Sequence, residues 1–282
     1  MELIVHLIAG IALCVITAIV VYKLQYKALA IALVMVLSAL FLGLSYFYNE
    51  MIGLELIITG AVFGYVAKRF SFQRYFITSV TIIWLLLLII HYMLYFVKGI
   101  DAVSGNQKII EEIINASSVP VTEKQVLSQQ LKDFLPLMRV LMPFSYFFSS
   151  AAISILVYAF VFAFFVRFKF LQTEDNTISL FRVDEWVVFL LIASWLVVLL
   201  GKESQTVWAI ALNIGLVLCV VYTIQGISVI LFLFEKKQWP KLYGFLILFV
   251  TILLGFQVMF FVITMLMGIG IIDFWMNFRK IA

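Results

Sequence analysis

The chain has 282 residues, of which 65% are hydrophobic and only 12% are charged. A soluble domain is about 45–50% apolar and roughly 25% charged, so this composition excludes an aqueous globular protein. The 19 Lys and Arg residues are scattered along the chain and form no basic stripe, so the net charge of +4 does not indicate nucleic-acid binding. The sequence predicts an integral membrane protein whose partner is the lipid bilayer, with no nucleic-acid partner.

Eight charge-poor apolar runs follow one another along the chain, and each predicts a membrane-spanning helix. In chain order they are Leu3–Tyr22, Ala28–Tyr48, Met51–Ala67, Tyr75–Val97, Val140–Val166, Trp186–Leu200, Thr206–Phe234 and Leu242–Ile272. The third and sixth runs fall short of the ~20 helical residues that a hydrocarbon core of ~30 Å requires. We expect an all-α polytopic membrane helical bundle of about eight transmembrane helices, which forms a single transmembrane domain over residues 1–282.

The last apolar run is longer than one span requires. Gly268 and Gly270 could bend it, so one long span and two short spans are both open. The residues that follow are interpreted as an interfacial tail, in which aromatic side chains form a belt and basic side chains a cationic end. They are Phe274, Trp275, Phe278, Arg279 and Lys280.

Basic residues in short connections orient membrane proteins, because they remain in the cytoplasm. The connections after the first, third, fifth and seventh runs carry Lys23, Lys27, Lys68, Arg69, Arg74, Arg167, Lys169, Arg182, Lys236, Lys237 and Lys241. Outside the one long loop, the opposite set has only Lys202, Arg279 and Lys280. We therefore expect both termini outside the cytoplasm. If the last run forms two spans, the carboxyl terminus moves inside.

The long connection, residues 98–139, has the pattern of an amphipathic helical loop. Isoleucines at 109, 110, 113 and 114 recur at helical spacing, and a second apolar stripe begins after Pro120. Two amphipathic helices lying on the outer membrane face are expected, either as a cover for the span ends or as a lid over a binding site. Pro120, Pro136, Pro143 and Pro240 are expected at or outside span ends, where a helix tolerates a lost hydrogen bond.

Enzyme signatures are missing from the sequence. It has no His-Glu-x-x-His zinc motif, no Gly-x-Ser-x-Gly nucleophile elbow and no Walker-type phosphate loop. A single intramembrane aspartate, Asp273, cannot form a catalytic dyad. We expect no enzymatic activity, no catalytic residue, no metal site and no cofactor.

Polar residues inside the predicted spans are the strongest functional signal, because ionisable groups in a bilayer usually face a bundle interior or a cavity. On the predicted topology His6, Glu55, His91, Asn213 and Asp273 share one depth in the outer half of the bundle. One interpretation is an outward-facing polar pocket for a small solute, with Glu55, His91, Asn213 and Asp273 as substrate-binding residues and at least Glu55 and Asn213 facing the interior. The alternative is that polar residues collect near span ends because they are tolerated there.

Small and amide residues indicate where helices pack. Gly60 and Gly64 form a Gly-x-x-x-Gly pattern, which lets two helix backbones approach closely. We expect this pair to pack inside the bundle, with an oligomer contact as the alternative. Gln225 and Gly226 are also assigned to helix packing, and Gln225 is placed to hydrogen-bond across helices.

The last quarter of the chain resembles a known family. Asn213, the pair Gln225-Gly226 and the ending Gly270-x-x-Asp273-x-Trp275-x-x-Phe278-Arg279 resemble the YybS-like family of uncharacterised bacterial integral membrane proteins. Members of that family often have a proline ahead of the tryptophan that opens the sixth span. Here Glu185 precedes Trp186 instead.

The resemblance implies a multi-pass protein of the bacterial cytoplasmic (inner) membrane. The family is distantly similar to the substrate-binding subunits of energy-coupling-factor transporters, which is an analogy at the level of the fold. Two functions follow as hypotheses. The first is a transport-type solute-binding subunit without intrinsic ATPase activity, which requires a separate ATPase or membrane partner subunit. The second is a non-transporting scaffold or accessory subunit that docks partner proteins.

Overall fold

The computed structural model describes residues 11, 14–23, 51–66, 71–98, 102–116, 120–169, 178–201, 204–240, 244, 251 and 253–279, and these contain helices and no β-strand. The elements are α3 (Met51–Val66), α4 (Phe72–Lys98), α5 (Ala102–Ala116), α6 (Val121–Arg167), the 3-10 helix η3 (Ile178–Leu180), α7 (Val187–Leu200), α8 (Gln205–Lys236) and α10 (Phe256–Met276). A shorter helix, Cys14–Lys23, precedes them.

Among the described residues, four helices are long and apolar enough to cross a membrane. They are Phe72–Met93 in α4, Thr122–Arg167 in α6, Gln205–Lys236 in α8 and Gln257–Met276 in α10. The apolar helix α7 is shorter. The predicted span Ala28–Tyr48 and most of Leu3–Tyr22 lie outside the described residues, so the total of eight remains a prediction.

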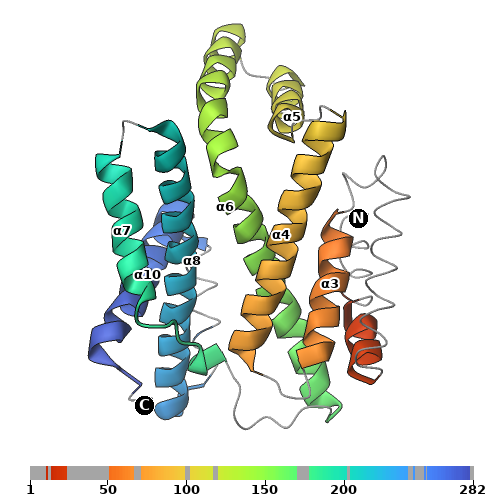
Figure 1. Ribbon diagram of the computed structural model, residues 1–282, viewed down its shortest axis with the longest axis vertical. Coiled ribbons are helices and arrows are strands. Elements are labelled where there is room, and N and C mark those ends of the chain that lie inside the picture. The colour runs from red at the N-terminus through yellow and green to blue at the C-terminus, as the bar shows by residue number, and fades with distance from the viewer. Residues whose placement is uncertain are drawn as a thin grey trace.

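The helices form two groups. Figure 1 shows α3, α4 and α6 on one side of the bundle and α7, α8 and α10 on the other, with α5 beside the upper part of α6. In that view α4 begins and α6 and α8 end at the lower end, whereas α5 lies at the upper end. Arg74, Arg167 and Lys236, which belong to the basic connections, therefore lie at one end of the bundle.

An aromatic core joins α3, α4 and α6. Phe63 packs edge to face against Tyr75 and Phe165, with ring centroids 5.2 and 5.3 Å apart. All three side chains are fully buried, and such ring pairs add about 0.5–1.5 kcal/mol beyond the burial of their area. Phe181, from the connection between η3 and α7, joins this core through an edge-to-face contact with Phe72.

Glycines set the closest approaches between helices. A Cβ added at Gly60 would collide with the backbone carbonyl of Cys14, and one at Gly64 with that of Ala18. The Gly-x-x-x-Gly pair therefore lies inside the bundle, against the helix Cys14–Lys23. The contact between α8 and α10 is built the same way, because Gly226 faces the carbonyl of Leu266 and Gly270 faces that of Tyr222.

Helix α6 differs from the prediction for the long loop. Its 47 residues extend about 70 Å, so the predicted second surface helix is instead the first part of the helix that continues into the membrane segment. Pro136 and Pro143 both lie inside α6. The expectation that prolines mark span ends is wrong for these two residues, because a long helix can continue past a proline when neighbouring groups take up its lost hydrogen bond.

The final apolar run is interrupted at a glycine. Gly255 precedes α10 with φ +92°, in the left-handed region that favours glycine. Gly268 and Gly270, where a bend was expected, lie inside α10. The run Leu242–Ile272 is therefore not one continuous helix. Most of its first part lies outside the described residues, so the alternative of two spans stays a prediction.

Candidate functional site

A buried ion pair lies at the carboxyl end of α10. Asp273 is in the last turn of that helix, which ends at Met276, and Asn277 then adopts a left-handed conformation with φ 42°. Asparagine tolerates this conformation better than most residues. The turn brings Arg279 back toward Asp273, so that Nη2 of the guanidinium lies 2.7 Å from Oδ2 of the carboxylate. Their side chains are 1% and 3% exposed, respectively.

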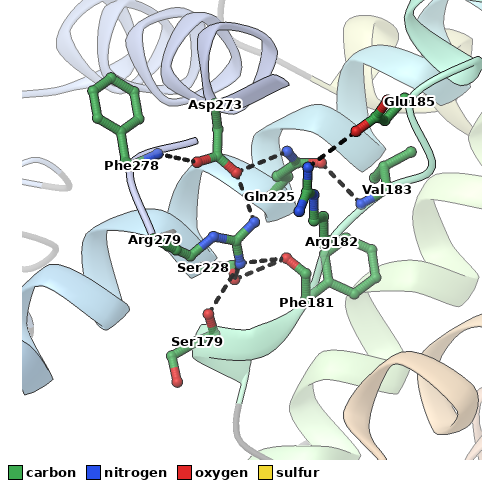
Figure 2. A network of polar contacts seen from close by, with 10 residues as sticks. All are labelled: Ser179, Phe181, Arg182, Val183, Glu185, Gln225, Ser228, Asp273, Phe278 and Arg279. Atoms are coloured by element: carbon green, nitrogen blue, oxygen red, sulfur yellow. Dashed lines mark hydrogen bonds and ion pairs between the residues drawn. The ribbon is translucent and has the colours of Figure 1, made fainter. Parts of the chain in front are cut away.

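Arg279 also binds the connection between α6 and α7. Its Nη1 donates to the carbonyls of Ser179 and Phe181, at 3.0 and 2.8 Å, and to Oγ of Ser228 on α8, at 2.8 Å. The Ser228 hydroxyl donates in turn to the Phe181 carbonyl at 3.0 Å. Figure 2 shows the guanidinium between these acceptors and Asp273. One cation therefore joins the end of the chain to α8 and to the connection that precedes α7.

Gln225 completes the network from α8. Its Nε2 donates to Oδ2 of Asp273 at 3.2 Å, and its Oε1 accepts from the backbone N–H of Val183 at 3.1 Å. The second carboxylate oxygen, Oδ1, accepts from the backbone N–H of Phe278 at 3.1 Å. We call Asp273, Arg279, Gln225 and Ser228, with the connection 179–183, the polar clamp (Figure 2).

Both charged side chains of the polar clamp are hydrogen-bonded to other groups of the protein. The Asp273 carboxylate accepts three donors, and the Arg279 guanidinium donates to four acceptors, which is what a buried pair needs to offset its loss of hydration. Both side chains are almost completely buried, so a solute could reach either charge only after the surrounding segments moved. The arrangement is therefore suited to fastening chain segments together.

The clamp corrects two predictions. Arg279 was assigned to an interfacial tail, yet it is only 4% exposed. Trp275 and Phe278, which were assigned to the same tail, are exposed as an aromatic belt requires. Asp273 was expected at the depth of Asn213, yet it is bonded to Gln225, which follows Asn213 by twelve residues on α8, or about 18 Å of helix. The error arose because the last run was counted as one span, which inverted the direction of α10.

Asn213 lies in the bundle interior, between α8 and α6. Its Oδ1 accepts from the backbone N–H of Phe144 at 2.9 Å, and its Nδ2 donates to the carbonyl of Val140 at 2.7 Å. Nδ2 also donates to the carbonyl of Ala209, one turn earlier on α8, at 2.8 Å. The expectation that Asn213 faces inward agrees with this geometry, and its hydrogen-bonding groups are engaged with backbone.

His91 is part of a smaller polar contact between α4 and α6. Its Nδ1 lies 3.1 Å from the hydroxyl of Tyr146, and the two rings pack with centroids 5.7 Å apart. Glu55 belongs to α3, and its side chain and the whole of His6 lie outside the described part of the chain. The structure thus separates Asp273 from Asn213 along α8, and a shared pocket of Glu55, His91 and Asn213 stays a prediction.

Several residues of these contacts carried no signal in the sequence. Ser179, Ser228 and Tyr146 are ordinary in composition, and only the fold brings them to Arg279 or His91. The family resemblance was more informative, because most of its motif residues converge. Gln225, Asp273 and Arg279 are bonded to one another, and the glycines beside them form the contact between α8 and α10. Among the described residues, no three His, Cys, Asp or Glu side chains are grouped to hold a metal ion.

Comparison with known proteins places the chain without assigning it an activity. No curated protein and no solved structure matches it. Residues 4–274 match a family described as predicted membrane protein (DUF2232). That match covers nearly the whole chain and agrees with the four apolar helices that are long enough to cross a membrane. The chain belongs to this family of predicted membrane proteins.

Proposed function

We propose that the chain is a non-catalytic scaffold or accessory subunit of the bacterial cytoplasmic membrane, a multi-pass protein whose helices dock partner proteins. The observation that carries the proposal is how the intramembrane polar groups are used. The Asp273 carboxylate and the amides of Gln225 and Asn213 are all bonded to groups of the chain itself. A solute site would require such groups to be open, whereas a scaffold requires them to fix the helices.

The lack of catalytic motifs in the sequence supports a role without chemistry. Exposed apolar side chains on three different helices supply surface for lipid and for other membrane proteins. Ile89 on α4, Leu196 on α7 and Phe261 on α10 are more than half exposed. A scaffold is expected to present at least one of these faces to a protein partner, and the others to lipid.

Photocrosslinking in native membranes tests this proposal. A photoreactive amino acid replaces Ile89, Leu196 or Phe261, one at a time, and Phe63, which is fully buried, serves as the matched interior control. We expect a protein adduct of one defined mass from at least one exposed position and no such adduct from the control. Lipid adducts alone at all three exposed positions would reject the scaffold.

A second candidate function is solute binding from the outer side, with a separate ATPase as the energy-coupling partner. The specific observation in its favour is the half-buried His91 and Tyr146 pair on α4 and α6, toward the end of the bundle that carries α5. The resemblance to the YybS-like family and its distant similarity to energy-coupling-factor subunits also support it.

Thermal unfolding of the purified protein against a panel of water-soluble vitamins and amino acids separates the two functions. Solute binding predicts a rise in Tm with one compound, because a ligand that binds only the folded state stabilises it. That rise should disappear in His91→Ala and weaken in Glu55→Gln. A panel in which no compound shifts the Tm contradicts solute binding by this class of ligand and leaves the scaffold proposal intact.

A further inference from the structure

The turn of α6 around Pro143 has an unusual set of partners. Proline has no N–H, so the helical hydrogen bond from residue 143 to the carbonyl of Arg139 cannot form. The next bond along an unbroken helix joins the N–H of Phe144 to the carbonyl of Val140. Asn213 contacts both of these groups, accepting from the first and donating to the second. A side chain of α8 therefore bridges α6 next to its missing bond.

A second helix holds the same turn. Nε1 of Trp84 on α4 donates to the carbonyl of Pro143 at 2.8 Å. The Asn213 amide is in turn oriented by its bond to the carbonyl of Ala209 within α8. Proline kinks in membrane helices persist where neighbouring side chains satisfy the freed backbone groups. Here Trp84 of α4 and Asn213 of α8 each bind backbone groups of this one turn of α6, at residues 140, 143 and 144.

We propose that α6 is hinged at Pro143 and that Asn213 is the positioning residue that holds the hinge angle. The moving part is the arm, defined as α5 with residues 121–139 of α6. The arm moves as one body because α5 packs on α6, through contacts that include the bond from Nζ of Lys124 to the carbonyl of Asn115 at 2.7 Å. It extends beyond the end of α4 (Figure 1), so a small change of angle at Pro143 displaces it widely.

The remainder of α6, residues 144–167, stays fixed in this proposal. The buried hydroxyls of Tyr75 and Ser79 on α4 bind its backbone and side chain at Ser154, at 2.9 and 3.0 Å. Phe165 lies in the aromatic core with Phe63. The hinge thus separates an arm with exposed apolar side chains, among them Val126 and Phe134, from a tightly packed membrane segment. This inference does not depend on either proposed function.

Distance measurements between two spin labels test the hinge. One label replaces Gln125 on the arm and the other Gln205 at the start of α8, both exposed, in a background with Cys14→Ala and Cys219→Ala. We expect a broad or two-peaked distribution in the parent protein. Pro143→Ala should narrow it, because the missing N–H returns, and Asn213→Ala should broaden it.

Two controls show whether the change in the distance distribution is specific to Pro143 and to the arm. Pro136→Ala changes the other proline of α6 and should leave the distribution as it is in the parent. A label pair at Gln205 and Lys236, both on α8, should give one narrow distance in every variant. A parent distribution as narrow as that of Pro143→Ala, or one that Pro136→Ala narrows equally, would overturn the proposal.

A thermal double-mutant cycle gives a second readout. Asn213→Ala should lower the Tm in the parent and lower it less in the Pro143→Ala background, because a continuous helix no longer needs the bridging amide. If Asn213 only fills space, the two substitutions are independent and their shifts add. Additive shifts together with unchanged distance distributions would show a structural contact without a hinge.

Discussion

At the scale of single residues, the buried pair of Asp273 and Arg279 distinguishes this bundle from a purely apolar one. A buried ion pair gives little net stability compared with well-packed apolar residues, but removing one partner leaves an uncompensated charge. A second ion pair, between Arg182 and Glu185, is much less buried, with side chains 27% and 70% exposed, and exposed pairs contribute only about 0–1 kcal/mol. The two pairs lie near each other in Figure 2 and differ mainly in burial.

Arg279→Met is therefore expected to destabilise the folded protein strongly, by about 3–5 kcal/mol, because it leaves the Asp273 carboxylate buried without its cation. Arg182→Met is the matched control, with an expected loss within about 1 kcal/mol. The measurement is thermal unfolding in detergent, followed by tryptophan fluorescence. Equal losses in the two variants would show that the clamp does not depend on the buried charge.

The double variant Asp273→Leu with Arg279→Met tests whether the loss of stability comes from an unpaired buried charge. Removing both charges should recover part of the stability lost in the single variant, because no unpaired charge remains. The hydrogen bonds to Gln225 and to the connection 179–183 stay broken, so recovery should be incomplete. A double variant that is as unstable as the sum of its singles would contradict coupling between the two side chains.

At the scale of elements, the contact between α8 and α10 depends on two glycines that let backbones touch. Gly270→Ala should separate the helices and lower the Tm, because its new methyl group meets the carbonyl of Tyr222. Gly268→Ala provides a control in the same helix, since no other atom lies within 4 Å of its added Cβ. Alanine has the higher helix propensity, so Gly268→Ala should hold or raise the Tm. A Tm change that is the same for both variants would mean that the close approach at Gly270 does not set the effect.

The sequence alone was sufficient to predict those helices whose pattern of apolar residues is local. The apolar runs at Tyr75–Val97 and Thr206–Phe234 lie inside α4 and α8, because twenty or more apolar residues specify a helix regardless of what surrounds them. The unbroken length of α6 could not be predicted in this way, since a polar stripe followed by an apolar run reads as two helices. Pro143 reinforced that error, and the partner that compensates for it, Asn213, is about seventy residues away.

The candidate site was predicted less well, because its residues meet only through tertiary structure. Gln225 was expected to bond across helices and Asn213 to face the bundle interior, and both positions agree with the structure, since an amide in a bilayer needs partners. The position of Asp273 depended on the number of spans before it. One interruption, at Gly255, moved it from one end of the bundle to the other.

At the scale of the whole molecule, each of the two helix groups is stabilised internally by a different kind of contact. The group around α3, α4 and α6 is held by aromatic packing, as between Phe63 and Phe165. The group around α7, α8 and α10 is held by the polar clamp and by glycine contacts. Phe181 takes part in both, because its ring packs on Phe72 while its carbonyl accepts from Arg279. The connection before α7 is therefore one place where the two groups are joined, and the bonds of Asn213 on α8 to the backbone of α6 are another.

This arrangement changes the expected topology at one end of the chain only. Arg279 binds the connection that contains Arg182, so it lies with the basic connections and not opposite to them. The charge asymmetry between the two ends of the bundle then becomes larger than the sequence count implied, which strengthens the orienting bias. The same bias predicts that the end with Lys237 is cytoplasmic and that the arm is outside.

Reporter fusions at three positions test this orientation. A fusion at Lys237 is expected to report the cytoplasm, and one after Lys132, in the arm, the opposite side, since α6 and α8 each cross the bundle between them. A fusion that follows the carboxyl terminus should agree with the one at Lys237, because the clamp holds Arg279 at that end. In the Arg279→Met variant, which releases the clamp, part of the carboxyl-terminal fusion should no longer report the same side as the fusion at Lys237. A carboxyl-terminal fusion that instead agrees with Lys132 would restore a single long last span, and would be incompatible with the interruption of the helix at Gly255 and with the buried pair.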